Sequence, residues 1–282
     1  MKIIHMTDTH FVEPGHVLYG KSPQKHLACA VKEINRIHAD AEMVVITGDL
    51  AHLGQEDAYA DLKATLAGLK MPCHLVIGNH DNRKALAGCF PSLLRDEHGF
   101  VQYCIEIKAG VFIMLDTKQE NTHRGTLCSD RLHWLARQFA IYSDRPKYLF
   151  MHHAPFATML PCIDSIGLEN SDALGDLIED TPSVRHIFCG HAHRPMSGSW
   201  RGVPVSGLRG LNHQVVLDFR SDREIIPLSF EQPQYGVCFI DSGAVLVHYH
   251  DFLDTESRFL MDDYEASIDR EEAGSADFTE TE

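Results

Sequence analysis

The chain alternates short apolar runs with longer amphipathic stretches, and this pattern predicts its secondary structure. Continuous runs of apolar and β-branched residues are typical of strands that are buried on both faces. Such runs occupy residues 2–6, 43–47, 73–77, 148–151 and 184–189. Between them, apolar residues that recur with helical spacing predict helices over 22–39, 57–69, 130–142 and 171–179. Strands and helices in alternation predict an α/β fold.

Short β segments replace this alternation from Ser199 onward. Strands are predicted within 202–207, 213–219 and 235–249, and Asp241-Ser242-Gly243 predicts a hairpin turn inside the last of these ranges. An earlier hairpin is predicted for 103–107 and 111–115, whereas 220–233 is expected to form an excursion or cap. Taken together, the elements predict two sheets that pack face to face with helices outside.

Side chains that can bind metal ions follow one predicted strand after another. Asp8 and His10 come directly after the first strand, and Asp49 follows the second behind a glycine. Three further strands end in Asn79-His80-Asp81, His152-His153 and His191-x-His193. Any one of these groups alone is most simply a polar turn, but ligands of open α/β sheets gather beyond the carboxyl ends of the strands. The recurrence therefore predicts a shared site at that edge.

The balance of charges limits the kinds of partner. The chain has 40 acidic and 25 basic residues, which gives a net charge of −15. Such an acidic chain is not expected to bind nucleic acids in general. Much of the negative charge lies in 261–282, whose few apolar residues predict a flexible, solvated tail. An anionic substrate must therefore be attracted locally, by metal ions or by individual basic groups.

The cysteines and the lengths of the apolar runs bear on the cellular compartment. The eight cysteines include no Cys-x-x-Cys pair, and several lie inside apolar runs, which is typical of reduced, buried thiols. The segment from Met1 to His5 runs into a strand without the long apolar region of a signal peptide. No apolar run approaches the ~20 residues that span a bilayer. We therefore expect a cytoplasmic protein that does not associate with membranes.

As a set, the polar groups at the strand ends resemble the motifs of the calcineurin-like metallophosphoesterases. The set consists of Asp8-x-His10, Gly48-Asp49, Gly78-Asn79-His80-Asp81, His152-His153 and Gly190-His191-x-His193, in the order of that family and within residues 3 to 195. The resemblance implies a four-layer α/β/β/α sandwich. It also implies a catalytic domain over 1–260, in which about 200–235 shapes the substrate pocket and the oligomer, so a homodimer or larger homo-oligomer is expected.

The same resemblance implies two metal ions at the strand ends. One ion would be held by Asp8, His10, Asp49 and His193, and the other by Asp49, Asn79, His152 and His191, with Asp49 and a hydroxide bridging them. His153, the second histidine of its pair, is expected to support the site or the fold and not to bind metal. Independently of the family, mixed imidazole and oxygen ligands suit Mn, Fe, Co or Zn. Two such ions would leave the site positive within an acidic protein.

Two more histidines are candidates for contact with the substrate. His80 follows Asn79, and the resemblance implies that it stabilises the transition state or protonates the leaving alkoxide. The alternative is that His80 only orients the bridging carboxylate. In similar enzymes a stretch like residues 201–205 precedes a segment that ends in His-Gln, and Asn212-His213-Gln214 matches that segment, so the resemblance implies that His213 faces the substrate. The alternative for His213 is a histidine that simply begins a strand.

Details of the motifs favour a phosphodiester over a phosphomonoester as substrate. The segment from Gly48 to Leu53 lacks the arginine found in the family's protein Ser/Thr phosphatases, and such an arginine matters most for a doubly charged monoester. The chain resembles most the bacterial glycerophosphodiesterases and the class III cyclic nucleotide phosphodiesterases, which implies hydrolysis of small phosphodiesters by a metal-bound hydroxide. The alternatives are a phosphomonoesterase or nucleotide pyrophosphohydrolase on the same scaffold, and a non-catalytic binding scaffold.

Overall fold

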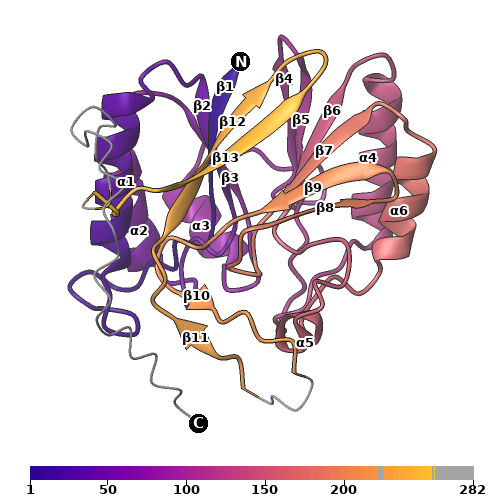
Figure 1. Cartoon of the computed structure of the whole chain (residues 1–282). Helices are drawn as coiled ribbons and strands as arrows, with labels where there is room; N and C mark the ends of the chain where they lie inside the picture. The colour runs from indigo at the N-terminus through magenta and orange to yellow at the C-terminus, as the bar shows by residue number, and fades with distance from the viewer. Residues whose placement is uncertain (221–224, 256, 258–282) are drawn as a thin grey trace, which may run out of the picture.

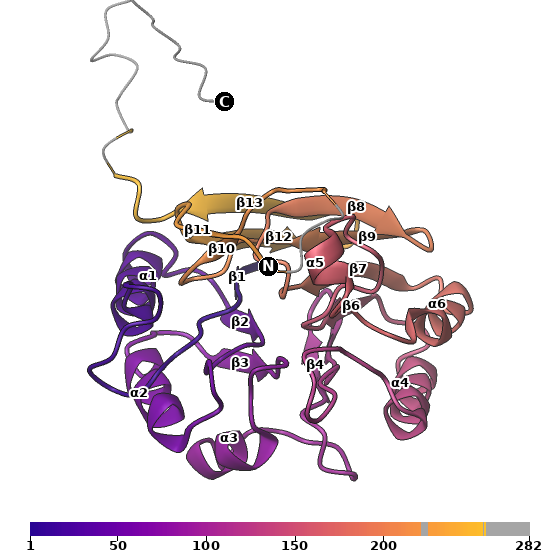
Figure 2. The same cartoon turned by 90° about the horizontal axis from the view of Figure 1, so that it is seen from below.

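The computed structural model describes residues 1–220, 225–255 and 257, which form two β-sheets packed face to face between layers of helices (Figures 1 and 2). Helices α1 (Pro23–Ile37) and α2 (Glu56–Leu66) cover the outer face of one sheet, and α4 (Ser129–Ile141) and α6 (Ser171–Glu179) cover that of the other. The four-layer α/β/β/α sandwich expected from the sequence is confirmed. The acidic tail predicted for 261–282 lies outside the described residues.

The first sheet has the strand order β13-β12-β1-β2-β3. Its strands are β1 (Lys2–Met6), β2 (Met43–Thr47), β3 (Cys73–Val76), β12 (Gln234–Ile240) and β13 (Val245–Asp251). Strands β1, β2 and β3 run parallel, with Ile4 opposite Val44, whereas β12 pairs antiparallel with β1. The hairpin predicted around 241–243 is confirmed, and it brings the C-terminal strands back to the first strand of the chain.

The second sheet has the strand order β4-β5-β6-β7-β9-β8. Its strands are β4 (Tyr103–Ile107), β5 (Gly110–Met114), β6 (Lys147–Phe150), β7 (Val184–Cys189), β8 (Met196–Trp200) and β9 (Val203–Gly207). Strands β5, β6, β7 and β9 run parallel, and antiparallel hairpins close both edges of the sheet. Because the central strands of each sheet are parallel, their carboxyl ends lie together at one edge of that sheet.

Apolar side chains hold the layers together. One continuous apolar cluster contains Met6 and Ile46 from the first sheet and Phe150 and Phe188 from the second, all fully buried. The rings of Phe150 and Phe188 stack with their centroids 4.5 Å apart, which couples β6 to β7. Each such side chain contributes about 1.5–3 kcal/mol through burial. Leu27 on α1 is also fully buried in this core, as its helical spacing predicted.

Two short elements lie beyond the carboxyl ends of the strands (Figure 1). Helix α5 (Pro161–Asp164) follows β6, and β10 (Gln214–Val215) pairs with β11 (Leu228–Ser229) to form a small separate sheet. Helix α3 (Arg83–Cys89) packs against α2. The sequence pattern did not predict α3, α5, β8 or β11, because elements this short have too few residues to establish a period.

The C-terminal region departs from the sequence-based expectation in two respects. The strand predicted for 213–219 is wrong in length, because the pairing with β11 ends near Val215 and both Leu217 and Phe219 are exposed. Strand β9 lies inside the second sheet, next to β7. Of the described residues in the region 200–235, 208–220 and 225–233 lie outside the two large sheets. The apolar residues Leu217 and Phe219 therefore lie at the surface and not in a strand.

None of the described helices is long and apolar enough to cross a bilayer. All eight cysteines lie in the described part of the chain and are free thiols, as predicted. Burial raises the pKa of the Cys189 thiol to about 12, so this side chain is an inert part of the core.

Candidate metal centre

The carboxyl ends of the parallel strands bring the predicted ligands to one place. The loops after β1, β2 and β3 of the first sheet and after β6 and β7 of the second supply them. The side chains are Asp8, His10, Asp49, Asn79, His152, His191 and His193, and all are buried. Residues separated by up to 185 positions in the sequence thus meet where the two sheets face one another.

The backbone is strained at most of these positions. Nine non-glycine residues have a positive φ in the described part, and five of them are predicted ligands: Asp8 (53°), His10 (47°), Asp49 (49°), His191 (66°) and His193 (49°). Each such residue costs of order 1–3 kcal/mol, and such strain gathers at functional sites. The loops also approach closely, since a Cβ on Gly78 would lie 2.2 Å from Asp49 Oδ1. Bringing these side chains together therefore lowers the local stability of the backbone at these positions.

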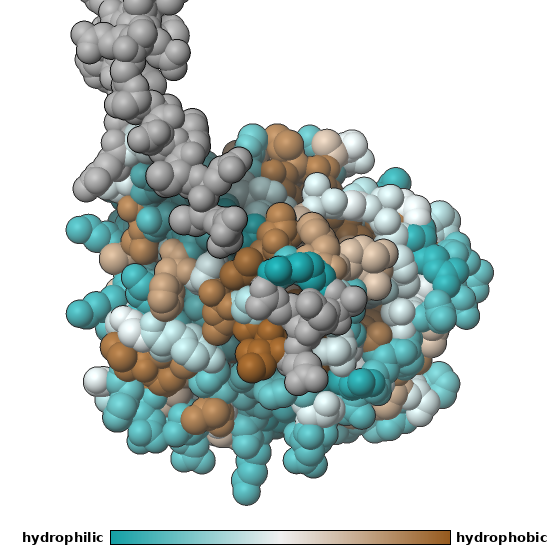
Figure 3. Space-filling model, turned by 60° about the horizontal axis from the view of Figure 1, so that its bottom comes forward, coloured by the Kyte–Doolittle hydropathy of each residue, from teal (hydrophilic) through white to brown (hydrophobic). Residues whose placement is uncertain are grey.

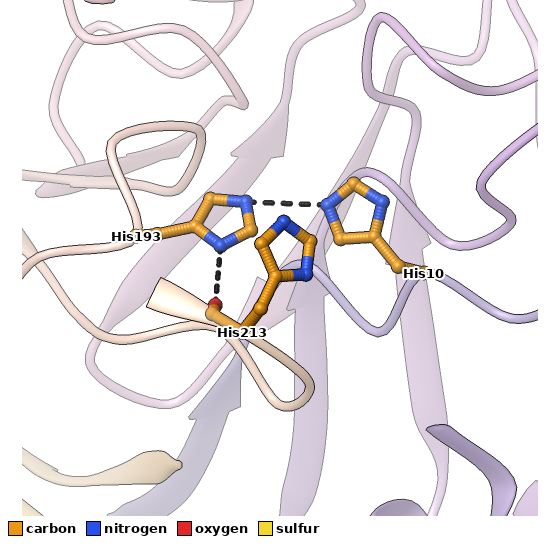
Figure 4. A group of neighbouring side chains, drawn as sticks. All are labelled: His10, His193 and His213. Atoms are coloured by element: carbon orange, nitrogen blue, oxygen red, sulfur yellow. Dashed lines mark hydrogen bonds between the residues drawn. The ribbon is translucent and has the colours of Figure 1, made fainter. Parts of the chain in front are cut away.

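Asp8, His10, Asp49 and His193 form the first cluster, with one possible ligand atom of each lying within 4.8 Å of the others. His193 Nε2 lies 3.1 Å from Asp8 Oδ1 and 3.2 Å from His10 Nε2. The rings of His10 and His193 point toward one another (Figure 4). His10 Nε2 also lies 3.7 Å from Asp49 Oδ2. This geometry suits four donors around one cation.

Asn79, His152 and His191 form the second cluster, which shares Asp49 with the first. His152 Nε2 lies 3.0 Å from Asn79 Oδ1 and 3.4 Å from Asp49 Oδ2. The rings of His152 and His191 lie with their centroids 5.0 Å apart. One oxygen, Asp49 Oδ2, is therefore close both to His10 of the first cluster and to His152 of the second. Asp49 has the position of a bridging carboxylate.

Unpaired buried atoms test whether a cation fits. Among the described residues, Asp8 Oδ1 and His191 Nε2 are buried without any hydrogen-bond partner. Buried polar atoms are nearly always paired, because leaving one unpaired costs about 1–3 kcal/mol. A metal ion in each cluster would satisfy both atoms. The donor set of imidazole nitrogens, carboxylates and one amide oxygen is that of borderline divalent metals. The residues therefore fit two metal ions.

Hydrogen bonds to backbone carbonyls orient two of the imidazoles. His193 Nδ1 lies 2.7 Å from the carbonyl oxygen of His213, and His152 Nδ1 lies 2.8 Å from that of Thr47. A carbonyl can only accept, so Nδ1 carries the proton in both rings and Nε2 faces the cluster with its lone pair. Such partners fix the tautomer and raise the affinity of metal-binding histidines.

Asp81 has a structural role that the sequence did not reveal. Its buried carboxylate accepts hydrogen bonds from the backbone N–H groups of Leu50 (3.1 Å), Ala51 (3.0 Å) and Gly78 (2.8 Å). Burial, with the nearby charge of Asp49, raises the pKa of Asp81 to about 6. Asp81 thereby ties the loop that carries Asp49 to the loop that carries Asn79.

The electrostatics of the clusters favour cations. Burial by itself raises the pKa of the Asp49 carboxyl, but His152 and His80 outweigh it and hold that pKa well below its usual range. Burial lowers the pKa of His10 and of His191 well below the usual value. For His152, Asp49 outweighs burial and raises the pKa to about 9. Metal ions bind to charged carboxylates and neutral imidazoles, and most of these side chains are in those forms. When no metal is bound, a proton on His152 supplies positive charge next to Asp49.

His153 and His80 each neighbour a predicted ligand but point in different directions. The ring nitrogens of His153 lie 2.8 Å from Thr117 Oγ1 and 3.1 Å from the His123 carbonyl, so both have partners outside the clusters, although one lies within 4.8 Å of possible ligand atoms of His152 and His191. His80 Nδ1 lies 2.7 Å from the His52 carbonyl, and His80 Nε2 lies 4.0 Å from Asp49 Oδ2. His80 therefore presents Nε2 to the centre, with its side chain partly exposed.

His213 lies beside the first cluster, directly before β10 (Figure 4). Its ring centroid is 4.6 Å from that of His193 and 4.8 Å from that of His10. Burial, with the charge of His193, lowers the pKa of His213 to about 3. The side chain is therefore neutral near pH 7 and can contact a substrate only as a neutral hydrogen-bonding group.

Two cavities open onto the clusters. One, of about 520 Å³, is bordered by histidines of both clusters and by apolar side chains from α5 and the β10–β11 region. The other, of about 820 Å³, is bordered by polar and charged side chains, among them Arg83, Lys84 and Lys118. The residues that line both cavities are Tyr19, His52, Asn79, His80 and His123.

His52 and His123 also belong to this site, although they were not predicted from the sequence. His52 Nδ1 lies 3.2 Å from His10 Nδ1, and His123 Nδ1 lies 2.9 Å from Asn79 Nδ2, which turns the amide oxygen of Asn79 toward His152. The closeness of His52 to Asp49 in the sequence was an available signal. His123 lies in a polar loop between β5 and α4, where no periodicity or strand end marks it.

The four-layer sandwich is similar in fold to solved structures of phosphatases. A dimetal phosphatase from Danio rerio has a TM-score of 0.67 at 16% identity, over 88% of this chain and 95% of that one. A purple acid phosphatase from yellow lupin seeds has a TM-score of 0.62 at 14% identity, over 90% of this chain and 52% of that one. At such identities the likeness concerns the fold alone.

Sequence comparisons name the family. A family model described as calcineurin-like phosphoesterase matches residues 1–195. A probable cyclic nucleotide phosphodiesterase of Rhodopseudomonas palustris is 43% identical over 93% of this chain and 97% of its own length. A glycerophosphodiester phosphodiesterase of Enterobacter lignolyticus is 30% identical over 88% of this chain and 92% of its own length. The chain belongs to the calcineurin-like phosphoesterase family, as its motifs implied.

Proposed function

We propose that this protein is a dinuclear metal-dependent phosphodiesterase that hydrolyses small phosphodiesters, either 3′,5′-cyclic nucleotides or glycerophosphodiesters. The observation that carries the proposal is the position of Asp49 Oδ2, 3.7 Å from His10 Nε2 and 3.4 Å from His152 Nε2. A carboxylate shared by two histidine clusters is the arrangement needed to hold two metal ions side by side. The relatives named as phosphodiesterases support the choice of reaction.

In this proposal Asp8, His10, Asp49 and His193 hold one ion, and Asp49, Asn79, His152 and His191 hold the other. The mixed donors suit Mn, Fe, Co or Zn. When bound, two such ions supply an activated nucleophile at neutral pH and neutralise the charge that develops on the phosphate. Two divalent ions against two carboxylates leave the site positive, which offsets the acidity of the chain for an anionic substrate.

His80 is the residue that we assign to proton transfer. Its Nδ1 is engaged with the His52 carbonyl, so Nε2 is the nitrogen that can give a proton to the leaving alkoxide. The alternative role for the His80 side chain is to orient the bridging carboxylate. The backbone N–H of His80 lies 2.9 Å from Asp49 Oδ1 and can orient this carboxylate without the side chain. The side chain is therefore available for the substrate. His213, neutral and beside the first cluster, is assigned to substrate contact.

The charged residues around the centre favour diesters over monoesters. Arg83 borders the larger cavity, but its guanidinium is already bound to the Asp116 carboxylate at 2.7 Å and to Glu120. Lys118 Nζ, in the same cavity, donates to the backbone carbonyl of Asn79 at 2.9 Å. Arg83 and Lys118 are therefore engaged, and the third basic residue of this cavity, Lys84, is not the arginine that is best suited to grip the doubly charged end of a monoester.

A panel of substrates tests the proposal. Protein loaded with Mn²⁺ or Co²⁺ is assayed with bis-p-nitrophenyl phosphate, cyclic AMP, a glycerophosphodiester and a monoester, and the Asp49→Asn variant serves as the inactive control. We expect diesters to be turned over at least tenfold faster than the monoester. Dominant monoester or pyrophosphate hydrolysis would instead favour the alternative reactions on this scaffold. Absence of both bound metal and hydrolysis would favour a non-catalytic scaffold.

Two further expectations belong to this proposal. We expect a homodimer or larger homo-oligomer, in which the region of about 200–235 contributes to the contact, and a cytoplasmic location. Light scattering on the purified chain tests the first, and fractionation of the producing cells tests the second. A monomer at micromolar concentration would contradict the expected assembly without affecting the assignment of the reaction.

A further inference from the structure

Tyr19 occupies a strained position in a tight turn beside the candidate metal centre. Leu18 and Lys21 exchange two backbone hydrogen bonds, of 2.8 and 3.0 Å, so that Tyr19 and Gly20 are the two central residues of the turn. Their φ angles, 51° and 78°, are both positive, as in a type I′ turn. Asn, Asp and Gly adopt these angles readily, whereas a bulky aromatic residue does so only under strain.

No contact that the fold requires explains an aromatic residue at this position. The Tyr19 side chain is 49% exposed, and its hydroxyl has no hydrogen-bond partner among the described residues. The turn is anchored by its neighbour Leu18, which is buried and whose carbonyl accepts a hydrogen bond from Asn212 Nδ2 at 3.4 Å. Asn or Gly at position 19 would form the same turn with less strain. Strain that stability does not require points to a function.

The ring of Tyr19 stands over histidines of the centre. It meets the ring of His213 edge to face, with centroids 4.9 Å apart, and that of His52 in the same way at 6.1 Å. Tyr19 also borders both cavities that open onto the clusters. The ring therefore forms part of the wall of both cavities, next to the clusters.

The smaller cavity is apolar on the side away from the clusters. Branched aliphatic side chains border it there, and they come from α5, the residues after it, and the β10–β11 region: Ile163, Ile166, Val215, Ile226 and Leu228. On this face of the molecule apolar residues gather toward the centre (Figure 3). An aromatic ring together with aliphatic side chains suits a flat, weakly polar group better than a glycerol, whose hydroxyls need hydrogen-bonding partners.

We propose that Tyr19 is a substrate-binding residue, and that its ring and the aliphatic side chains of the smaller cavity receive a flat, ring-bearing arm of the phosphodiester, such as a nucleobase. This inference rests on the proposed phosphodiesterase function and selects nucleotide-derived diesters as the substrate class. The phosphate lies at the metal clusters, and the ring-bearing arm extends along Tyr19. The strain at Tyr19 is retained because Asn, which the turn prefers, cannot provide this contact.

Binding of products tests the inference without reference to turnover. The full chain, loaded with Mn²⁺, is titrated calorimetrically with AMP and with ribose 5-phosphate, which differ in the base. We compare wild type with Tyr19→Asn, which suits the turn but removes the ring, and with Tyr19→Phe, which keeps the ring. Val17→Ala is the matched control, because Val17 lies in the same loop, is 60% exposed and borders neither cavity.

We expect wild type, Tyr19→Phe and Val17→Ala to prefer AMP over ribose 5-phosphate. In Tyr19→Asn this preference should fall about tenfold, the scale of a base–aromatic contact, while the affinity for ribose 5-phosphate and the Mn²⁺ content stay the same. The Tm of Tyr19→Asn should equal or exceed that of wild type, because the turn is relieved of strain. A merely structural role for Tyr19 would lower the Tm and leave the preference for AMP unchanged.

The two proposals fail in different ways. No preference for AMP in wild type, or an equal preference in Tyr19→Asn, overturns the ring-binding role even if diesters are hydrolysed. Absence of diester hydrolysis, with the preference for AMP present in wild type and lost in Tyr19→Asn, overturns the phosphodiesterase assignment and supports the ring-binding role.

Discussion

The floor of the candidate active site and the walls above it are built in different ways. The floor consists of the seven metal-ligand candidates, Asp8, His10, Asp49, Asn79, His152, His191 and His193, which are all buried and follow the ends of parallel strands. The walls consist of the Tyr19 turn, the loop 118–123, helix α5 and the β10–β11 region, which are short elements or loops with exposed side chains.

The two regions also differ in how they are held. The floor is fixed by the sheets and by buried hydrogen bonds such as those of Asp81, so its geometry changes only if the core changes. The walls are held by a small separate apolar cluster, in which Leu160, Ile163 and Val215 pack against Ala192, and by a few ion pairs. Arg194, directly after the ligand candidate His193, pairs with Glu231 at 2.5 Å and holds the β10–β11 region. The difference indicates that the floor sets the reaction, whereas the walls set which substrate reaches it.

The largest effect is expected from the floor residue that both clusters share. Asp49→Asn should lower metal content and reduce diester hydrolysis by more than about a hundredfold, because even the hydrogen-bond partners of metal ligands cost about 10–100-fold when removed. Metal analysis and steady-state kinetics measure both effects. Asp180→Asn, at the exposed end of α6, is the control and should behave as wild type. Full metal content in Asp49→Asn would remove the bridge from the proposed centre.

His80→Ala separates chemistry from metal binding. It should leave the metal content intact and lower kcat about 10²–10⁴-fold, because it removes a proton donor and no ligand. The exposed His16, replaced by Ala, controls for the loss of a histidine. Loss of both metals from His80→Ala would place this residue among the structural supports of the floor and overturn its role as the acid.

Asn79→Ala distinguishes the two halves of the floor. Asn79 contributes to the second cluster only, and it is the one uncharged, non-imidazole ligand candidate. The variant should bind one metal ion with normal affinity and the other at least about tenfold more weakly. Calorimetric titration with Mn²⁺ resolves the two sites. Equal weakening of both ions would mean that Asn79 holds the loop of Asp49 and does not belong to a single cluster.

A change in the walls should affect substrate choice alone. Leu228→Ala removes an aliphatic group that is 40% exposed at the smaller cavity and should weaken AMP binding about threefold to tenfold, with unchanged metal content. Leu246→Ala, on β13 and 51% exposed, is the matched control away from the cavities. A similar loss in both variants would indicate a general effect on stability and no contact with the ligand.

The last expected effect is on stability and not on the reaction, and it concerns His186, a buried histidine on β7. Burial lowers the pKa of His186 to about 4, whereas the unfolded chain takes up this proton near pH 6.5. The contribution of neutral His186 to stability is therefore complete above pH 6.5 and is lost as the pH falls toward 4. His186→Gln can still hydrogen-bond to Ser206 but does not titrate.

Urea unfolding from pH 7 to pH 4.5 measures this contribution. The wild type should lose stability relative to His186→Gln by roughly 2 kcal/mol between pH 7 and pH 5. His133→Gln, at an exposed position on α4, should follow the wild type. Parallel pH profiles for wild type and His186→Gln would show that His186 is protonated in the folded state near its ordinary pKa.

The regularity of the floor explains why the sequence predicted it. The run Met43–Thr47 is buried throughout, as a central parallel strand must be, and Asp49 comes two residues after it. The same relation holds between β1 and Asp8. Since parallel strands end at one edge of a sheet, knowing the strands is enough to bring these residues together. The helices α1 and α4 were likewise predicted to within two residues at their ends, because each has a long apolar stripe.

The walls were predicted poorly because they lack the regular strands that made the floor predictable. His123 and Tyr19 lie in loops, where no period in the sequence tells which residues will be neighbours. Residues 215–219 alternate like a strand, yet Leu217 and Phe219 are exposed because β11 pairs only with Gln214 and Val215. In the sequence Asp81 only marks the end of a motif. Its hydrogen bonds to backbone N–H groups of two loops show that it holds these loops together.

The sequence by itself determined the fold class, through hydrophobic periodicity, and the family, through the motifs at the strand ends. The same motifs predicted the seven residues of the floor and the shared position of Asp49. Only the tertiary structure decided that His80 directs Nε2 toward the two clusters and that Tyr19 stands over them in a strained turn. These are relations in space between residues from different loops. They arise from the packing of two sheets against each other, which local sequence does not encode.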